Sequence, residues 1–366
     1  MKTAFIPGLK LSEDYYKEIV RPIMDSAFPG LAHAAGLIDG GSEVLGLDDE
    51  TSMDHDWGPR LMFFLSEPDY ARYSNQIKQV LALQIPCEFK GYPTNFTAPD
   101  PKDGGTQVLQ PIAGGPVNHH VSLQTVRGFF RDYLGFDIEQ RLEPADWLTF
   151  SEQRLCTISR GAVFHDELGL NAARNRFAYY PKDVWLYLLA AVWRRIGQEE
   201  HLMGRAGMVG DEVGSALIGA RLVRDVMRLC FLMEKVYAPY PKWFGSAFKQ
   251  LACSKTLWPV LLGVLHSETW QSRQRHLIQA YKFIAVRHNA LKLTRPLPEK
   301  VIPFYDRPFQ VIAQQGFAQA LLKKIQDPDV KRIAERSVIG SLDLFSDNVD
   351  LVSDPSWHAK LRQLIG

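Results

Sequence analysis

The stretch Gly40-Gly41-Ser42 is followed, twelve residues after Ser42, by Asp54-His55-Asp56. Glycines lack a Cβ, so the backbone at this point can turn tightly and approach a phosphate, while the serine hydroxyl donates a hydrogen bond to it. An apolar run lies on each side, at 34–38 and at 61–65. This order predicts two strands around a candidate nucleotide site.

The two acids point to a metal. We expect a strand over 55–65 that carries them and pairs with the strand over 34–38. Side chains at i and i+2 of a strand share a face, so Asp54 and Asp56 would bind one or two hard divalent cations. Mg²⁺ suits them because it takes one or two carboxylates and completes its shell with water and substrate phosphates. The alternative interpretation is an ordinary acidic hairpin.

The combined pattern resembles the signature of the polymerase-β-like nucleotidyltransferase superfamily, which includes the aminoglycoside nucleotidyltransferases. It resembles more closely the DUF4037 proteins, an uncharacterised bacterial family of that superfamily. One departure is His55, because the superfamily usually has an apolar residue between the acids. The segments that carry the resemblance are 41–46, 52–60, 127–135, 219–224 and 237–243.

The resemblance implies an α+β fold. Residues 1–143 would form a nucleotidyltransferase α/β domain with a mixed sheet flanked by helices, and residues 144–366 an all-α helical bundle that selects the acceptor. The apolar periodicity agrees with helices in both parts. Helices are predicted over 12–27, after a cap at Ser12, and over 68–82, 183–196, 211–236, 255–265 and 269–286.

A third acid often completes such a site, as a base or as a ligand of a second metal. Glu88, on a strand predicted over 85–90, resembles the superfamily's third carboxylate. The rival assignment places the third strand at 117–126, where His119 or His120 would act and Ser122 or Gln124 would occupy the acid's place. Both assignments stay open.

The segment from 91 to 118 joins these two candidate strands. It is rich in Pro, Gly, Asn and Asp, lacks periodicity and is too long for an ordinary connection. The sequence is compatible with a lid over the substrates and equally with surface disorder.

Basic residues in the helical part are candidate phosphate ligands. Arg221, Arg224, Arg228 and Lys235 lie near one face of the 211–236 helix, where they would meet a triphosphate or form ion pairs on a solvated face. The resemblance implies that Lys242 approaches the nucleotide phosphates; the alternative is a surface lysine packed on Trp243. Glu212 is an acceptor-binding acid or an ordinary acid at a helix start.

Composition narrows the class of protein. The chain has 366 residues, 46% of them hydrophobic, enough for a large core and two domains. A formal net charge of +1 and no basic tract interleaved with aromatics make nucleic acid a less favoured partner. Four widely spaced cysteines argue against zinc and disulfides. No apolar run has membrane-spanning length, so we expect a cytoplasmic protein, and a homodimer is compatible with the apolar helices.

These observations lead to one functional hypothesis. An Mg²⁺- or Mn²⁺-dependent nucleotidyltransferase would move a nucleoside monophosphate from a nucleoside triphosphate, with ATP the expected donor, to the hydroxyl of a small molecule. The alternative is a catalytically inactive nucleotide-binding sensor or scaffold. The assigned residues are Asp54, Asp56 and Glu88 for catalysis, Asp54 and Asp56 for metal, and Gly41, Ser42, Lys242 and Arg221 for nucleotide.

Overall fold

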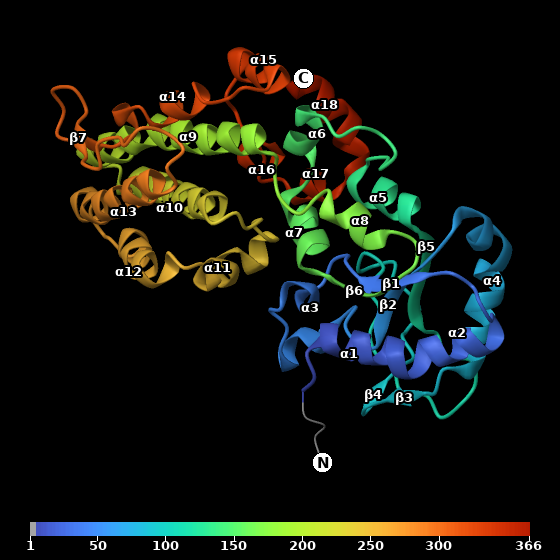
Figure 1. Ribbon diagram of the computed structural model, residues 1–366. Helices are drawn as coiled ribbons and strands as arrows, with labels where there is room; N and C mark the ends of the chain where they lie inside the picture. The colour runs from blue at the N-terminus through green and yellow to red at the C-terminus, as the bar shows by residue number, and fades with distance from the viewer. Residues whose placement is uncertain (1–4) are drawn as a thin grey trace. The chain divides into compact units, whose positions relative to one another are not determined.

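The computed structural model describes residues 5–366 and has a mixed α/β fold (Figure 1). The chain divides into two compact units. The first unit comprises the residues up to 141 together with 153–178, and the second comprises 142–152 and 179–366. Residues 153–178 thus pack with the first unit, although they follow the boundary expected after residue 143.

A four-stranded mixed sheet forms the centre of the first unit, in the order β5-β2-β1-β6. Strand β1 (Ala34–Leu37) is antiparallel to both β2 (Arg60–Leu65) and β6 (Ala162–Asp166), and β2 is parallel to β5 (His120–Thr125). The predicted pairing of the two apolar runs is confirmed, with Ala34 opposite Phe64. The pairing of β6 with β1 was not foreseen, because the paired residues Gly36 and Val163 are 127 positions apart in the chain and no local pattern records such a contact.

One face of this sheet is covered by the first helical segment of the chain (Figure 1). This segment runs through α1 (Gly8–Tyr15), a π-helical turn η1 (Tyr16–Val20) and α2 (Arg21–Ala27). The predicted cap at Ser12 is wrong, since Ser12 is buried within α1 and the helix begins after Pro7. Its buried tyrosines pack against alternate residues of β2, Leu61 and Phe63, which face the core.

Further helices complete the first unit. The predicted helix over 68–82 is confirmed as α4 (Glu67–Gln84). Helix α5 (Val126–Leu134) packs on the sheet face opposite to the one that the first helical segment covers, where the Phe129 and Phe64 ring centroids are 6.0 Å apart. The bounds are α3 Ser42–Leu45, η2 Glu50–Asp54, α4 Glu67–Gln84, α5 Val126–Leu134, α7 Glu152–Arg160, whose first residue belongs to the second unit, and α8 Leu170–Asn175.

The predicted strand over 85–90 does not join the central sheet. Of these residues only Glu88 and Phe89 form a strand, β3 (Glu88–Phe89), which pairs with β4 (Tyr92–Pro93) in a separate two-stranded sheet. Gly91, with φ of 84°, makes the tight turn between them. Residues 91–118 then fold back on themselves, with the Phe96 N–H donating to the Asn118 carbonyl and the Thr97 N–H to that of Val108.

The second unit is mainly helical. The expected helices near 183, 211, 255 and 269 are present, and α9 continues past the predicted end at 196 because Glu200 is buried rather than solvated. A hairpin of β7 (Ile302–Pro303) and β8 (Gln310–Val311) departs from an all-α domain. The helices are α6 Pro144–Thr149, α9 Lys182–Met208, α10 Glu212–Met233, α11 Pro241–Gln250, α12 Ser254–Leu265, α13 Trp270–Ala290, η3 Ala313–Gln315, α14 Phe317–Leu322, α15 Pro328–Arg336, α16 Leu342–Phe345, α17 Val349–Ser353, η4 Pro355–Trp357 and α18 His358–Ile365.

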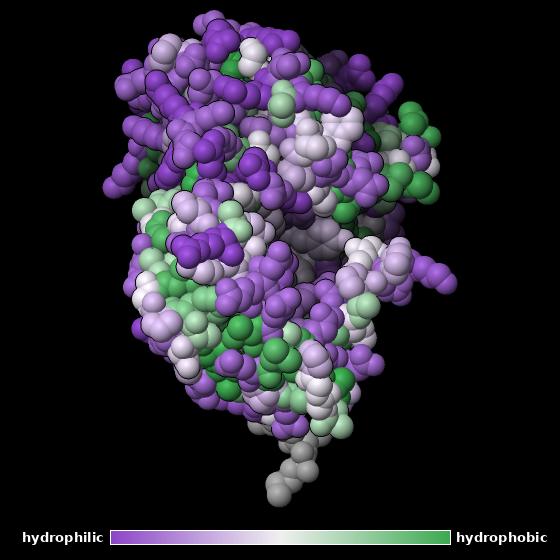
Figure 2. Space-filling model, turned by 90° about the vertical axis from the view of Figure 1, so that its right-hand side faces the viewer, coloured by the Kyte–Doolittle hydropathy of each residue, from purple (hydrophilic) through white to green (hydrophobic). Residues whose placement is uncertain are grey.

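Two surface properties accompany this fold. Within residues 5–366, no helix combines the length and apolar character needed to cross a bilayer. On the face seen in Figure 2, hydrophilic and hydrophobic residues are interspersed. Three of the four cysteines are buried, and within the described residues none of the four forms a disulfide.

Candidate functional site

The glycine turn, the two acids and His120 of the first unit lie at one edge of its central sheet. Strand β1 ends at this edge, whereas β2 and β5 begin there, with Gly36 opposite Met62 and Arg60 opposite His120. The glycine turn follows β1 directly, and the acids precede β2. Strand pairing therefore brings together loops that are separate in the sequence.

The glycine turn depends on Gly41. Its φ of 149° lies in the region that favours glycine, and a Cβ there would lie 2.5 Å from Glu43 Oε2 and 2.7 Å from Arg60 Nη2. A Cβ on Gly40 would meet no atom within 4 Å. Gly41 is thus required by its backbone and by two close side chains, and Ser42 begins α3 immediately after it.

Arg60, the first residue of β2, holds the glycine turn. Its Nη2 donates to the Gly40 carbonyl at 2.6 Å, its Nε to Glu43 Oε1 at 2.8 Å and its Nη1 to Asp39 Oδ1 at 3.3 Å. Both Arg60 and Glu43 are buried. Burial lowers the pKa of Arg60, but the carboxylates of Glu43 and Asp39 outweigh it and the pKa rises, so this guanidinium stays charged.

Asp54 and Asp56 lie in a loop and not on the predicted strand. Asp54 ends the 3₁₀ turn η2, which starts with a capping box between Asp49 and Ser52, and Asp56 has a left-handed φ of 49°. The strand is thereby delayed to Arg60, so the argument that residues i and i+2 share a strand face does not apply. Asp54 is exposed and its carboxylate lies 3.1 Å from His55 Nδ1.

Asp56 is held by the long segment 91–118. Its N–H donates to the Gln107 carbonyl at 2.8 Å, and its Oδ1 accepts from the Gln107 N–H at 3.2 Å. The Gln107 side chain donates to the Thr97 carbonyl at 2.6 Å and meets His120 Nε2 at 2.9 Å through its Oε1. The segment therefore links β5 to the loop that carries Asp54 and Asp56, which we call the acid loop.

The third strand of the site is β5, which corresponds to the rival assignment. Glu88 lies exposed on the separate β3–β4 sheet, so its predicted place on a strand beside the acids is wrong. His120 begins β5, and its ring stacks on Phe96 with centroids 4.4 Å apart. Burial lowers the pKa of His120, and the charge of Arg60 lowers it further, whereas Asp56 acts in the opposite direction. The net lowering favours a neutral imidazole.

The neighbouring positions of β5 carry no carboxylate. Ser122 and Gln124 share the face of His120, as the alternation of a strand requires. His119 turns the other way and contacts the Lys78 carbonyl at 3.2 Å.

The basic candidates of the second unit all have partners within that unit. Arg221 pairs with Glu199 at 2.9 Å, and Lys242 lies over the Trp243 ring, 5.1 Å from its centroid. Glu212 accepts from the Trp270 N–H at 3.0 Å. The remaining pairs are Arg224 with Asp347, Arg228 with Glu152 and Lys235 over Trp185.

Three residues at the site edge had no predicted role: Asp39, Arg60 and Gln107. Asp39 precedes the glycines and Arg60 follows the acids. An acidic and a basic residue on either side of the motif were therefore the sequence signal for this ion pair. Gln107 gave none, because its contact with Asp56 spans 51 residues of the chain.

The donor set at this edge fits a hard cation. Asp54 and Asp56 offer exposed carboxylate oxygens, and Mg²⁺ needs only one or two of them when phosphates and water supply the rest. Within residues 5–366, the one group of three or more His, Cys, Asp or Glu ligand atoms lying within 4.8 Å of one another is elsewhere, at His33, His165 and Glu167.

Comparison with known proteins gives one family match. Residues 147–244 match the model of a domain of unknown function, DUF4037. No curated protein matches the chain. The crystal structure of a nucleotidyltransferase-like protein from Exiguobacterium sibiricum is similar at a TM-score of 0.31 and 11% identity, over 80% of this chain and 83% of that one. The expected resemblance to DUF4037 is therefore confirmed for residues 147–244, which include the segments 219–224 and 237–243.

Proposed function

We propose that the first unit binds a nucleoside triphosphate with Mg²⁺ at this sheet edge and transfers its nucleoside monophosphate to an acceptor hydroxyl. The observation that carries the proposal is the set of Arg60 bonds to Asp39, Gly40 and Glu43. These bonds hold the glycine turn against the first residue of β2, directly after the acid loop. The glycine turn, which is the phosphate cradle of this proposal, and two exposed carboxylates thus share one edge.

Each residue has a role in this proposal. The backbone at Gly41 and the Ser42 hydroxyl bind triphosphate oxygens, and Asp54 and Asp56 hold the metal. Mg²⁺ or Mn²⁺, when bound, would neutralise phosphate charge. ATP is the proposed donor and a small molecule the proposed acceptor.

His120 replaces Glu88 as the proposed proton acceptor. Because Gln107 donates its amide N–H to Thr97, its oxygen faces His120 Nε2, which must therefore carry the proton. The lone pair of the neutral ring is then on Nδ1. The acceptor oxygen would bond to the α-phosphorus, the bond to the bridging oxygen would break, pyrophosphate would leave and the hydroxyl proton would pass to this base.

Nucleotide titration tests the proposal. ATP, GTP, CTP and UTP are titrated calorimetrically into wild type, Asp54→Asn and Asp56→Asn, each with and without Mg²⁺, and pyrophosphate release is followed with a panel of sugar and nucleoside acceptors. We expect Mg²⁺-dependent binding that falls at least about tenfold in either variant, because a metal ligand is lost. Asp103→Asn, an exposed acid of the long segment, is the matched control. Equal binding and turnover in all four proteins would contradict the metal assignment.

A nucleotide sensor is the second candidate. It is favoured by the face of β5, where His120, Ser122 and Gln124 stand and no carboxylate does. Thermal stabilisation by Mg²⁺ and nucleotide without pyrophosphate release would support the sensor. If no nucleotide raises the melting temperature and no pyrophosphate is released, the scaffold is the interpretation that remains.

A further inference from the structure

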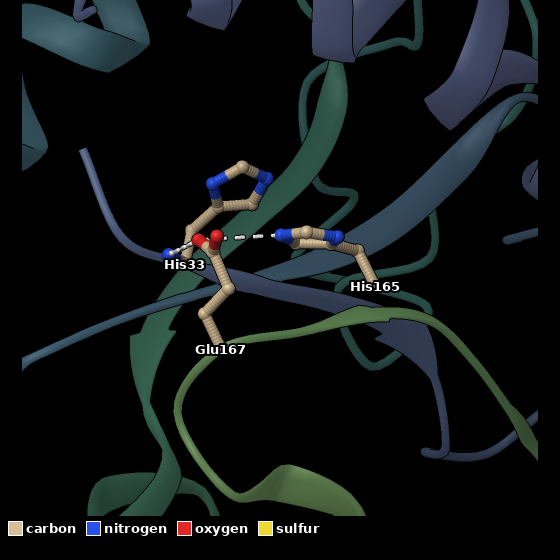
Figure 3. Close-up of side chains that lie close together, drawn as sticks. All are labelled: His33, His165 and Glu167. Atoms are coloured by element: carbon tan, nitrogen blue, oxygen red, sulfur yellow. Dashed lines mark hydrogen bonds and ion pairs between the residues drawn. The ribbon is translucent and has the colours of Figure 1, made fainter. Parts of the chain in front are cut away.

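A second cluster of polar side chains lies at the opposite edge of the central sheet, where β1 begins and β6 ends. His33 immediately precedes β1, His165 lies in β6 and Glu167 follows it. The register places Ala34 opposite Asp166 and so brings the three residues together. Figure 3 shows the Glu167 carboxylate and the His165 imidazole approaching each other beside the His33 ring.

The spacing of the donor atoms matches a metal. One ligand atom from each of His33, His165 and Glu167 lies within 4.8 Å of the others, and His165 Nε2 is 3.3 Å from Glu167 Oε2. Two ligands about 2.0–2.1 Å from a tetrahedral zinc ion are themselves about 3.3 Å apart.

His33 is prepared to act as a neutral ligand. Its Nδ1 lies 3.1 Å from the Leu31 carbonyl and donates to it, which leaves the lone pair on Nε2, now 2.9 Å from the Tyr16 hydroxyl. A backbone carbonyl on the far nitrogen is the usual outer partner of a metal-binding histidine. Its ring stacks on Phe63 with centroids 4.6 Å apart and meets the His165 ring in a tilted arrangement at 4.5 Å, and both contacts fix its orientation.

One ring nitrogen of His165 lacks a well-formed hydrogen bond. Its Nε2 is buried and finds no hydrogen bond of acceptable geometry among residues 5–366, although Glu167 is close. The 3.3 Å contact to Glu167 is therefore an ion pair without the geometry of a full hydrogen bond. Glu167, half exposed, opens the cluster to solvent and gives an ion a way in.

We propose that His33, His165 and Glu167 form a binding site for one divalent transition-metal ion, for which Zn²⁺ is the probe, with water as the fourth ligand. Two imidazoles and one carboxylate select zinc-like ions over Mg²⁺ and Ca²⁺, which prefer oxygen. The ion would join the start of β1 to the end of the edge strand β6 and would stabilise the folded first unit by binding to it.

Zinc titration of the full chain, stripped of metal with a chelator, tests this site. We expect one Zn²⁺ per chain, no binding of Mg²⁺ at this site, a higher melting temperature with Zn²⁺, and the visible absorption of a tetrahedral complex when Co²⁺ is added. His165→Gln and Glu167→Gln should each weaken Zn²⁺ binding at least about tenfold, through the loss of one of three ligands. His266→Gln, an exposed histidine of the second unit, is the matched control.

The readouts separate this site from the nucleotide site. Asp54→Asn and Asp56→Asn should bind Zn²⁺ as wild type does. The melting temperatures of the metal-free variants show whether they are folded. If a variant does not fold, the Co²⁺ spectrum of the wild-type protein tests the proposed ligand set instead. Undiminished Zn²⁺ binding in both His165→Gln and Glu167→Gln, its loss in the aspartate variants, or no binding by wild type would overturn the proposal.

Discussion

Arg60 shows how one buried charge can position a flexible turn. Moving a guanidinium out of water is costly, and the cost is offset only when good hydrogen bonds satisfy it. Here Glu43, Asp39 and the Gly40 carbonyl supply those bonds. Burial raises the pKa of Glu43, while Arg60 acts in the opposite direction.

At this scale we predict that Arg60→Leu destabilises the first unit. The change leaves the Glu43 carboxyl buried without its cation, so the free energy of unfolding should fall by about 3–5 kcal/mol, measured by urea denaturation. The double variant Arg60→Leu, Glu43→Leu should recover much of the loss, since no buried charge remains. Arg131→Leu, an exposed arginine, is the control and should change little. A single variant as stable as wild type would show that the ion pair contributes nothing.

The glycine turn between β1 and α3 is an element whose shape depends on one position. We predict that Gly41→Ala lowers the free energy of unfolding by about 1–3 kcal/mol, because a side chain at this φ is strained and its Cβ meets Glu43 and Arg60. Gly40→Ala is the matched control, with no atom within 4 Å of its new Cβ. Thermal denaturation of the pair gives the comparison, and equal losses would contradict the account of the turn.

The segment 91–118 is an element held by contacts to the acid loop and β5. We predict that Gln107→Ala lowers stability by about 1–2 kcal/mol and speeds amide hydrogen exchange near residue 107, because the Thr97 and His120 contacts are lost. In Gln110→Ala the exposed side chain is removed and the backbone bonds to Asn95 stay. Exchange that is equally fast in both variants, or unchanged in both, would count against the anchoring role of Gln107.

At the scale of the whole molecule, buried acids make stability depend on pH. Burial raises the pKa of Glu200 to about 7, although its carboxylate accepts the N–H groups of Ile312 and Ala313. Between about pH 4.5 and about pH 7 the folded chain therefore keeps a proton that the unfolded chain releases. The stabilisation is complete below the unfolded pKa and is lost as pH rises through this window.

Glu200→Gln removes this titration. We predict that, between about pH 5 and about pH 8, wild type loses about 2 kcal/mol more unfolding free energy than the variant does. Denaturant melts of both proteins at the two pH values measure the difference. Histidines with lowered pKa, such as His288, are common to both proteins and cancel. Parallel pH profiles would show that Glu200 does not titrate in this range.

The sequence by itself determined the elements that depend on local pattern. The apolar runs of β1 and β2 and the periodic segments of α4, α10, α12 and α13 appear close to where they were predicted. Hydrophobic periodicity is a property of neighbouring residues, so burial of one face is readable without a structure. The glycine turn between β1 and the acid loop was also readable, because adjacent glycines mark a tight turn in the local sequence.

Only the tertiary structure decided how distant segments meet. It placed Asp54 and Asp56 in a loop before β2, where Asp56 is held by Gln107, 51 residues further along the chain. It placed Glu88 outside the central sheet. His33 and Glu167, 134 residues apart, meet through the pairing of β1 with β6. Such contacts are fixed by strand register and core packing, which depend on the whole chain and leave no local signature.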